Sequence, residues 1–221
     1  KVWINGIDIA DYGGQLRMEY KTSGYQLDKA AFKGRNRSSF VLLTSTTGFM
    51  TIVLPVVFEG TDRDDVTRKK SLFDMLIFGK NELLMDDGFQ YSAYLSAIGD
   101  SSYPAPELIE VEYTLIGVRH GDKVTVTGNT VACDSTLPDT DCILSCTVGT
   151  SGTGYKVGSV TFKSVTAGQR LVVDGINKRI LVDGVPAAEK AEWIQFPSLK
   201  PGLNNLECAD TLTVEFYPVY F

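Results

Sequence analysis

A two-residue alternation of apolar and polar side chains, repeated along much of the chain, restricts the possible folds more than any other feature. In residues 109–115, which read IEVEYTL, apolar side chains occupy the odd-numbered positions and polar side chains the others. Residues 89–97 and 212–217 repeat the pattern. This period buries one face of a β-strand and leaves the other face in water. The sequence therefore predicts a mainly β protein.

Turn residues separate the predicted strands. Asn5-Gly6 lies between two short apolar runs and predicts a two-residue hairpin, because both central positions of such a turn need a positive φ. Asp87-Gly88 leads into the next alternating strand, and residues 171–184, LVVDGINKRILVDG, predict a hairpin followed by a further turn. The almost continuously apolar residues 49–58 predict a strand covered on both faces, in which Pro55 indicates an edge position or a bulge.

One amphipathic helix is predicted over residues 64–78. Its apolar face consists of Val66, Phe73, Leu76 and Ile77. Thr61 or Asp62 can cap the N-terminus, and Gly79 suits the left-handed position after the C-terminus. The basic residues 68–70 are expected on the solvated face. We expect this helix to cover one face of a sheet.

The composition changes near residue 121, which predicts two domains. Residues 1–120 are expected to form a sheet-rich or barrel-like domain with the helix. In residues 121–221 helical signals vanish and the content of Thr, Ser and Gly rises, which is typical of a small β-sandwich. Residues 149–158, GTSGTGYKVG, predict a flexible loop or a tight hairpin.

Charge and hydrophobicity exclude several classes of protein. With 43% hydrophobic and 22% charged residues the chain can build a core, which excludes a disordered tail. The 21 basic and 27 acidic residues give a net charge of −6, which disfavours nucleic acid and anionic membranes as partners. No uncharged run is long enough for a transmembrane helix. The chain starts without methionine, as a strand and turn rather than a signal peptide, which predicts that a preceding segment was removed.

Cysteine and histidine are too few and too widely spaced for a typical metal site. The four cysteines are Cys133, Cys142, Cys146 and Cys208. Their spacing lacks the short pairs of a zinc ribbon, so unpaired thiols are favoured over zinc, although the even number permits two disulfides. The sequon Asn36-Arg37-Ser38 is short enough to occur by chance and matters only in a secreted protein.

Motifs for catalysis are missing. His120 is the single histidine and stands in a predicted turn next to Gly121; Asp122 is close, but no G-x-S-x-G elbow accompanies them. The Walker pattern is absent, and no helix follows the glycines within residues 149–158 to receive a phosphate. A surface histidine is therefore the favoured interpretation, and we predict no catalytic, cofactor-binding or metal-binding residues and no enzyme activity.

Two weaker functional patterns remain. Asp134, Asp139 and Asp141 share one loop and could bind calcium or act as the paired carboxylates of a hydrolase, but a polar loop is favoured because an EF-hand needs a different pattern. Three aromatic residues could stack on sugars: Trp193, Tyr155 and Tyr217. Packing in a core or interface is the simpler role for them. A carbohydrate-binding module and, less favoured, a hydrolase are therefore the alternatives to a structural protein.

The end of the chain resembles a known family. Residues 196–206, FPSLKPGLNNL, followed by a terminal strand at 211–217, resemble the "FP-x-L-x-PG-x-N" segment of phage distal tail proteins, the Dit family. The helix at 64–78 followed by a long aromatic strand at 82–98 is similar to the order of elements in that family's N-terminal domain. The hairpin around Val173-Asp174-Gly175 and the phrase Val126-Thr127-Gly128-Asn129 resemble its C-terminal domain.

This resemblance implies a structural protein of a long, non-contractile-type phage tail or of a prophage-derived particle, without catalytic residues. It implies a homo-hexameric ring between the tail tube and the tip and receptor-binding proteins. Residues 1–120 would build the ring, and residues 121–221 would form a galectin-like sandwich for which a cell-surface glycan is a possible ligand. The location implied is the virion tail, after assembly in the cytoplasm of a bacterial host.

Overall fold

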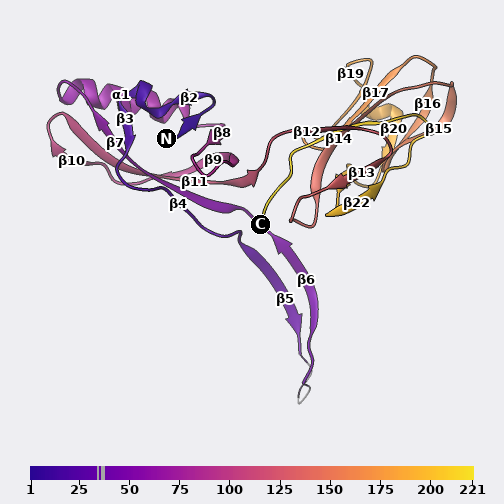
Figure 1. The fold of residues 1–221 in the computed structure, drawn as a ribbon, viewed down its shortest axis with the longest axis horizontal. Coiled ribbons are helices and arrows are strands. Elements are labelled where there is room, and N and C mark those ends of the chain that lie inside the picture. Colours follow the sequence, from indigo (N-terminus) through magenta and orange to yellow (C-terminus); the bar gives the residue numbers. More distant parts are fainter. Residues whose placement is uncertain (34, 36–37) are drawn as a thin grey trace. The chain divides into compact units, whose positions relative to one another are not determined.

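Antiparallel strands account for most of the chain, as the alternation predicts. The structure, a computed structural model, describes residues 1–33, 35 and 38–221, so Asn36 and Arg37 of the sequon lie outside the described residues (Figure 1). The chain divides into two units: residues 1–120 together with Phe221, and residues 121–220. The described residues contain no helix that is long and apolar enough to cross a membrane.

The first unit is one curled sheet with a helix, plus a separate hairpin. Its elements are β1 (Trp3–Ile4), β2 (Ile7–Asp8), a 3-10 helix (Ile9–Tyr12), β3 (Gly14–Leu16), β4 (Lys21–Thr22), β5 (Leu27–Phe32), β6 (Val41–Thr47), β7 (Met50–Glu59), α1 (Arg63–Leu76), β8 (Lys80–Leu84), β9 (Gln90–Ile98), β10 (Ser102–Ala105) and β11 (Leu108–His120). The sheet has the order β2-β1-β8-β9-β11-β7-β3, with β4 beside β7 and β10 beside β11. Figure 1 shows α1 lying across one face of the curled sheet.

The aromatic core of this unit joins α1 to the two longest strands. Phe73 of α1 is fully buried, with its ring centroid 5.3 Å from that of Phe58 on β7 and 5.1 Å from that of Tyr113 on β11. The Tyr113 hydroxyl donates a hydrogen bond of 2.5 Å to Asp74 of α1. The alternating residues of β11 therefore face the helix, and the predicted amphipathic helix is confirmed.

The ends of α1 follow the sequence only in part. Asp62 caps the N-terminus, where its carboxylate accepts a hydrogen bond of 2.9 Å from the Asp65 amide. The prediction for Gly79 is wrong: the helix ends at Leu76, and Gly79 has no positive φ. The expected solvation of the basic residues 68–70 is also partly wrong, because the Lys70 side chain is only 15% exposed and forms an ion pair of 2.7 Å with Asp74.

Strand β7 corrects the prediction that residues 49–58 are covered on both faces. Of the two alternatives for Pro55, it excludes the edge position and favours the bulge, because the pairing register on β7 shifts between β3 and β4. The even-numbered side chains of β7 are buried, but Thr51, Val53 and Val57 are half-exposed, so one face rather than both is covered. Pro55 is not on an edge, because β11 pairs with one side of β7 and β3 and β4 pair with the other. Pro55 lies where β3 has ended and β4 has not begun, and its carbonyl accepts from the Arg17 amide at 2.9 Å. Its nitrogen faces the same gap, where no donor is needed.

Gly117 of β11 marks a close approach between strands and gives a test of this sheet. A Cβ atom there would lie 2.3 Å from the Ser92 carbonyl oxygen and 2.7 Å from the Ala93 Cα on β9. Since both are backbone atoms, Gly117→Ala is expected to lower the free energy of unfolding in urea by about 1–3 kcal/mol. Gly79→Ala, where nothing lies within 4 Å, is the control and should change it by less than about 0.5 kcal/mol. Equal effects would contradict the tight packing of β9 on β11.

The second unit contains two main sheets. Its elements are β12 (Val124–Thr127), β13 (Thr130–Cys133), β14 (Thr140–Thr147), β15 (Gly152–Val157), β16 (Val160–Val165), β17 (Arg170–Asp174), β18 (Arg179–Val182), β19 (Val185–Pro186), a 3-10 helix (Ala188–Lys190), β20 (Ala191–Trp193), β21 (Ser198–Leu199), β22 (Gly202–Asn205) and β23 (Thr213–Phe216). One sheet has the order β12-β23-β14-β17-β18-β19, and the other has the order β15-β16-β20. Strands β13 and β22 pair with each other, and β21 pairs with β14.

The core of this unit lies between the two sheets, which confirms the predicted sandwich. Leu144 and Phe216 from the larger sheet share one buried cluster with Val160 and Phe162 from the smaller sheet. Residues 149–158 are predicted to form either a flexible loop or a tight hairpin, and they belong to a hairpin. Strand β15 turns at Gly158, which has a φ of 60°, into β16.

Two of the predicted turns are present in the structure. Asn5-Gly6 has φ values of 53° and 80° and joins β1 to β2, as predicted. In the turn after β17, the buried Asp174 carboxylate accepts hydrogen bonds from the Asn177 amide at 2.8 Å and from Arg179 at 3.0 Å. Burial raises the pKa of this carboxyl, but the hydrogen bonds outweigh that effect and hold it below the usual range.

The lowered pKa of Asp174 predicts a pH dependence of stability. A carboxylate whose pKa is lower in the folded than in the unfolded chain stabilises the fold above its unfolded pKa. That contribution decreases as the pH falls below about 4 towards the folded pKa. Asp174→Asn should therefore flatten the decrease in Tm between about pH 4 and pH 2, as measured by circular dichroism. An unchanged slope would contradict the role of this carboxylate.

Candidate interaction surface

The hairpin of β5 and β6 extends from the first unit without covering any other element. Its two strands pair only with each other among the described residues, from Leu27↔Thr47 to Phe32↔Val41. Figure 1 shows it as a long arm beyond the sheet. Every described side chain of both strands is exposed or, at Thr47, half-exposed. A two-stranded hairpin is marginally stable in water, so this arm needs a partner or a firm base.

The base of the arm is firmly held by Tyr25. This side chain is buried, its hydroxyl accepts a hydrogen bond of 2.9 Å from the Arg119 amide, and its ring lies 5.6 Å from that of Phe221. Desolvation raises the pKa of Tyr25. The Gln26 amide donates to the Phe49 carbonyl at 3.0 Å, and the Gly48 amide donates to the Gln26 carbonyl at 2.7 Å. The direction of the arm is therefore fixed where it leaves the sheet.

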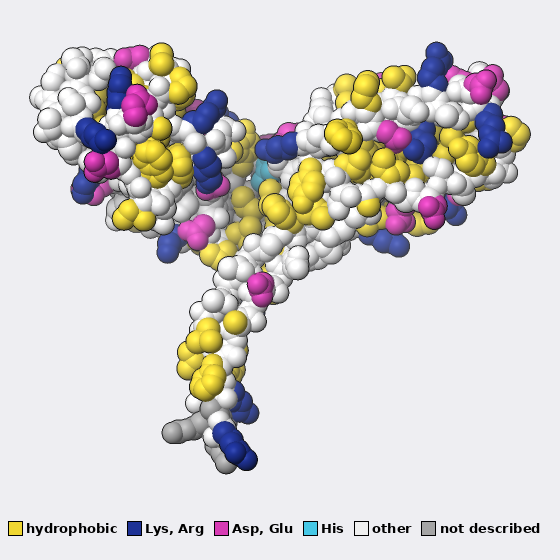
Figure 2. Space-filling view, turned by 180° about the vertical axis from the view of Figure 1, so that it is seen from behind, with side chains coloured by type: hydrophobic (Ala, Val, Ile, Leu, Met, Phe, Trp, Pro, Cys, Tyr) yellow, Lys and Arg dark blue, Asp and Glu magenta, His cyan; other side chains and the backbone are white. Residues whose placement is uncertain are grey.

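The exposed part of the arm is rich in apolar side chains. Those exposed are Leu27, Phe32, Phe40, Val41, Leu42 and Leu43. Figure 2 shows hydrophobic side chains gathered on the arm, with basic ones near its end. The described basic residues of this segment are Lys29, Lys33 and Arg35, in a chain whose net charge is −6. Apolar patches on an exposed surface mark sites of protein association. The arm is the strongest candidate interaction surface.

Sequence reasoning missed this arm. The signal was present: two strand-like runs flank the turn-rich residues 33–39, KGRNRSS. The apolar run Phe40–Leu43 is typical of a buried strand, and the structure instead places its side chains in water. A strand that is buried only on assembly has the same apolar pattern as a strand of the core. The sequence of one chain therefore does not distinguish the two.

His120 is not a surface residue, contrary to the favoured interpretation. It ends β11, is 6% exposed, and its Nε2 lies 3.2 Å from the Glu82 carboxylate. The hydrogen bond from His120 and that from Ser92 overcome partial burial and lower the pKa of Glu82. The structure thus assigns the histidine to a polar pair within the first unit, in which a buried imidazole contacts an exposed carboxylate.

The three aspartates at positions 134–141 do not converge, and they do not share one loop as predicted, because Asp141 lies in β14. Asp134 accepts from the Tyr220 hydroxyl at 3.4 Å, Asp139 from the Ser198 hydroxyl at 3.1 Å, and Asp141 pairs with Lys178 at 2.9 Å. Within residues 1–33, 35 and 38–221, no three or more His, Cys, Asp or Glu side chains are grouped to hold a metal ion. Separate partners on each carboxylate favour the polar loop.

The aromatic side chains considered for sugar stacking lie in different environments. Trp193 is 40% exposed, and its ring centroid lies 5.8 Å from that of Phe196. The Tyr155 hydroxyl donates a hydrogen bond to the Asp210 carboxylate, and Tyr217 is half-buried. A pocket of about 360 Å³ in this unit is lined by other residues: Lys163, Ser164, Thr166, Gln169, Val182, Glu189 and Lys190. The aromatic residues therefore do not frame that pocket.

Comparison with solved structures identifies the fold. No protein-family model matches the sequence, and no curated protein matches it. The crystal structure of the SPP1 Dit protein matches with a TM-score of 0.74 and 15% identity, over 100% of this chain and 98% of the SPP1 chain. This chain has the Dit fold. The predicted resemblance to the Dit family is confirmed for the fold, in both units.

More distant matches belong to the baseplate of phage P2. Two structures of that baseplate in its activated conformation, with Ca and with Sr, match with a TM-score of 0.51 and 10% identity. Each covers 98% of this chain and 93% of the other. The similarity in fold therefore extends over nearly the full length of this chain and of each matched chain.

Proposed function

We propose that this chain is a distal tail protein of a phage or prophage-derived particle. In this proposal, six copies form a ring that joins the tail tube to the tip and receptor-binding proteins. The whole-chain agreement with SPP1 Dit carries the proposal, because that structure is described as a paradigm of the hub adsorption apparatus in phages that infect Gram-positive bacteria. The role is structural, without turnover, and the location is the virion tail after assembly in the host cytoplasm.

The surface of the first unit supports a ring. A ring closes through a head-to-tail interface, which needs two different surfaces on each copy. The exposed arm is one such surface. A second apolar surface is formed by Leu72, Met75 and Phe78, at and just after the end of α1. We therefore assign ring formation to residues 1–120.

The mass of the purified protein in solution tests this function. Light scattering is expected to find a species of about six times the 24.2 kDa chain mass, and negative-stain images of it should show six-fold rings. A monomer at every concentration, with or without a tail-tube partner, would contradict the proposal.

Carbohydrate binding is the second candidate function, and it is assigned to the sandwich of the second unit. The observation in its favour is the exposed Trp193 ring, since aromatic faces commonly stack on apolar ligand surfaces. A glycan screen with the full chain, and with Trp193→Ala as the control, tests it. Binding that is lost in Trp193→Ala would support this candidate, and no binding by either protein would exclude it.

A further inference from the structure

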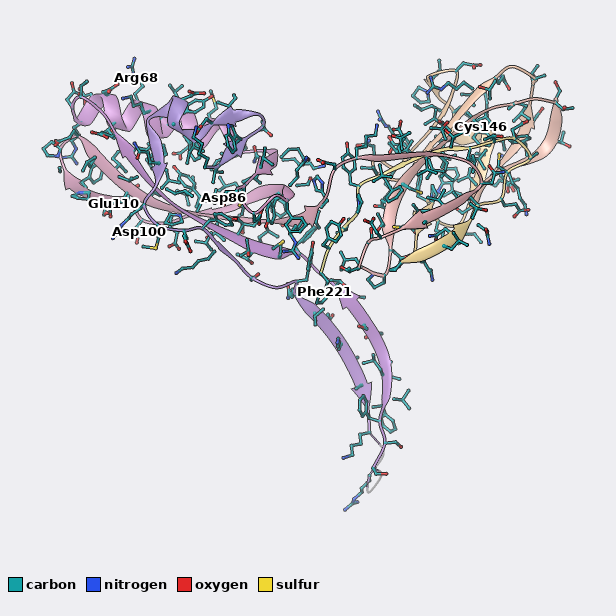
Figure 3. The ribbon with its side chains drawn as sticks, in the orientation of Figure 1. Arg68, Asp86, Asp100, Glu110, Cys146 and Phe221 are labelled. Atoms are coloured by element: carbon teal, nitrogen blue, oxygen red, sulfur yellow. The ribbon has the colours of Figure 1, made fainter. Side chains whose placement is uncertain are left out.

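Two cysteine sulfurs lie in contact inside the second unit. The Sγ atoms of Cys146 and Cys208 are 3.9 Å apart, although the residues are 62 positions apart in the sequence. Both are free thiols, and Figure 3 shows Cys146 among the strands of this unit. A disulfide needs an S–S distance of about 2.05 Å, so the two sulfurs must approach by only about 1.9 Å.

The two cysteines belong to opposite sheets of the sandwich. Cys146 lies on β14 and pairs with Leu171 of the larger sheet. Cys208 forms an isolated antiparallel bridge with Val157, at the end of β15 in the smaller sheet, and the neighbouring Gly158 amide donates to the Glu207 carbonyl at 2.8 Å. A bond between these sulfurs would therefore join the two sheets.

Hydrogen bonds hold the segment of Cys208 in place. The Asn129 side-chain amide donates to the carbonyls of Cys208 at 3.0 Å and Asp210 at 3.1 Å. The Tyr155 hydroxyl lies 3.6 Å from the Cys208 sulfur and 3.9 Å from the Cys146 sulfur, and it donates to the Asp210 carboxylate at 2.5 Å. The sulfur contact is thus part of a fixed polar cluster rather than a chance approach of two mobile side chains.

The pair has one accessible and one buried member. Cys208 is partly exposed, whereas Cys146 is buried. The hydrogen bond between the two sulfurs lowers the pKa of Cys208, and the same contact together with burial raises the pKa of Cys146. The thiolate is the reactive form of cysteine, so Cys208 is the group that an external oxidant meets first.

We propose that Cys146 and Cys208 form a disulfide when the protein meets an oxidising medium containing a low-molecular-weight disulfide. The Cys208 thiolate attacks one sulfur of that disulfide and expels a thiolate, which leaves a mixed disulfide on Cys208. Cys146 then loses its proton to solvent, and its sulfur attacks the Cys208 sulfur and expels the second thiolate. Two protein thiols are oxidised, and one external disulfide is reduced to two thiols.

The other two cysteines do not compete for this reaction. Cys133 and Cys142 are both buried, and the Cys133 thiol donates to the Ser135 hydroxyl at 3.3 Å. Burial raises the pKa of Cys142 to about 12, which leaves little thiolate at neutral pH. The new bond would link sites distant in the sequence, which restricts the unfolded chain and stabilises the sandwich.

Oxidation of the purified full chain with oxidised glutathione tests the proposal. The folded protein is treated, quenched, denatured and alkylated, and its intact mass and tryptic peptides are measured. We expect two of the four thiols to disappear with the loss of two hydrogen atoms. Tryptic residues 124–156, which carry Cys133, Cys142 and Cys146, should be linked to residues 191–221, which carry Cys208. Fragmentation of this pair should find the alkyl label on Cys133 and Cys142, which places the bond between Cys146 and Cys208. The Tm of the oxidised protein should exceed that of the reduced protein by at least about 5 °C.

Matched variants show whether the pair is specific. Cys208→Ala should keep all its remaining thiols reduced, whereas Cys133→Ser, at a buried position outside the pair, should oxidise like the unchanged protein. The proposal is overturned by four persistent thiols, by a glutathione adduct on Cys208 that Cys146 does not displace, or by a disulfide bond whose sulfur comes from Cys133 or Cys142. Because linkage is mapped in the unchanged protein, a variant that fails to fold does not decide the result.

Discussion

Val41→Asp is expected to convert the proposed ring into monomers. Val41 lies in the exposed arm, opposite Phe32 across the β5–β6 pair, and is 60% exposed in the single chain. Assembly would bury this position, and a carboxylate without a partner in an apolar interface loses its hydration. A central interface residue contributes about 2 kcal/mol or more, and a six-fold ring repeats the loss at every interface. Light scattering should then find the mass of one chain, 24.2 kDa.

Val185→Asp is the matched control for this change. Val185 has the same side chain and is 64% exposed, but it lies on β19 of the second unit. The control should retain the ring, and circular dichroism spectra of both variants should equal that of the unchanged protein. A ring that persists in Val41→Asp would remove the arm from the interface. Loss of the ring in both variants would indicate a general effect of charge.

Much of the fold could be predicted because its local rules agree with the structure. The alternation in residues 109–115 identifies the buried face of β11, and Asn5-Gly6 adopts the positive φ values that its hairpin needs. The capping carboxylate of Asp62 marks the start of α1. Each of these features depends on residues that are close in the sequence, so pattern and propensity are sufficient to find it.

The features that escaped prediction depend on distant contacts. Pro55 is accommodated by a gap between two strands that come from an earlier part of the chain. The approach of Cys146 to Cys208 depends on how two sheets face each other. The apolar side chains of the arm stay exposed because, among the described residues, its strands pair only with each other. No local pattern carries information on these arrangements.

Phe73→Ala is expected to cause the largest loss of stability in the first unit. The Phe73 ring is fully buried between Phe58 and Tyr113 and lies 6.3 Å from the Tyr12 ring, so its removal leaves a cavity between α1 and the sheet. Such a truncation lowers the free energy of unfolding by about 3–5 kcal/mol. This is a large part of the total for a typical domain. The urea midpoint should fall accordingly, and the Tm should decrease by more than about 10 °C.

Met75→Ala is the control, since Met75 lies on the same helix and is 72% exposed. Its free energy of unfolding should change by less than about 0.5 kcal/mol, because alanine is a good helix former and no core contact is lost. Both variants are best measured in the Val41→Asp background, so that assembly does not add to the stability. Similar losses in Phe73→Ala and Met75→Ala would contradict the packing of α1 on the sheet. As single substitutions, the two changes can also be compared in their effect on the ring. If Phe73→Ala loses both the ring and the native circular dichroism signal while Val41→Asp loses the ring alone, the stability of the unit is separated from the contact made by its arm.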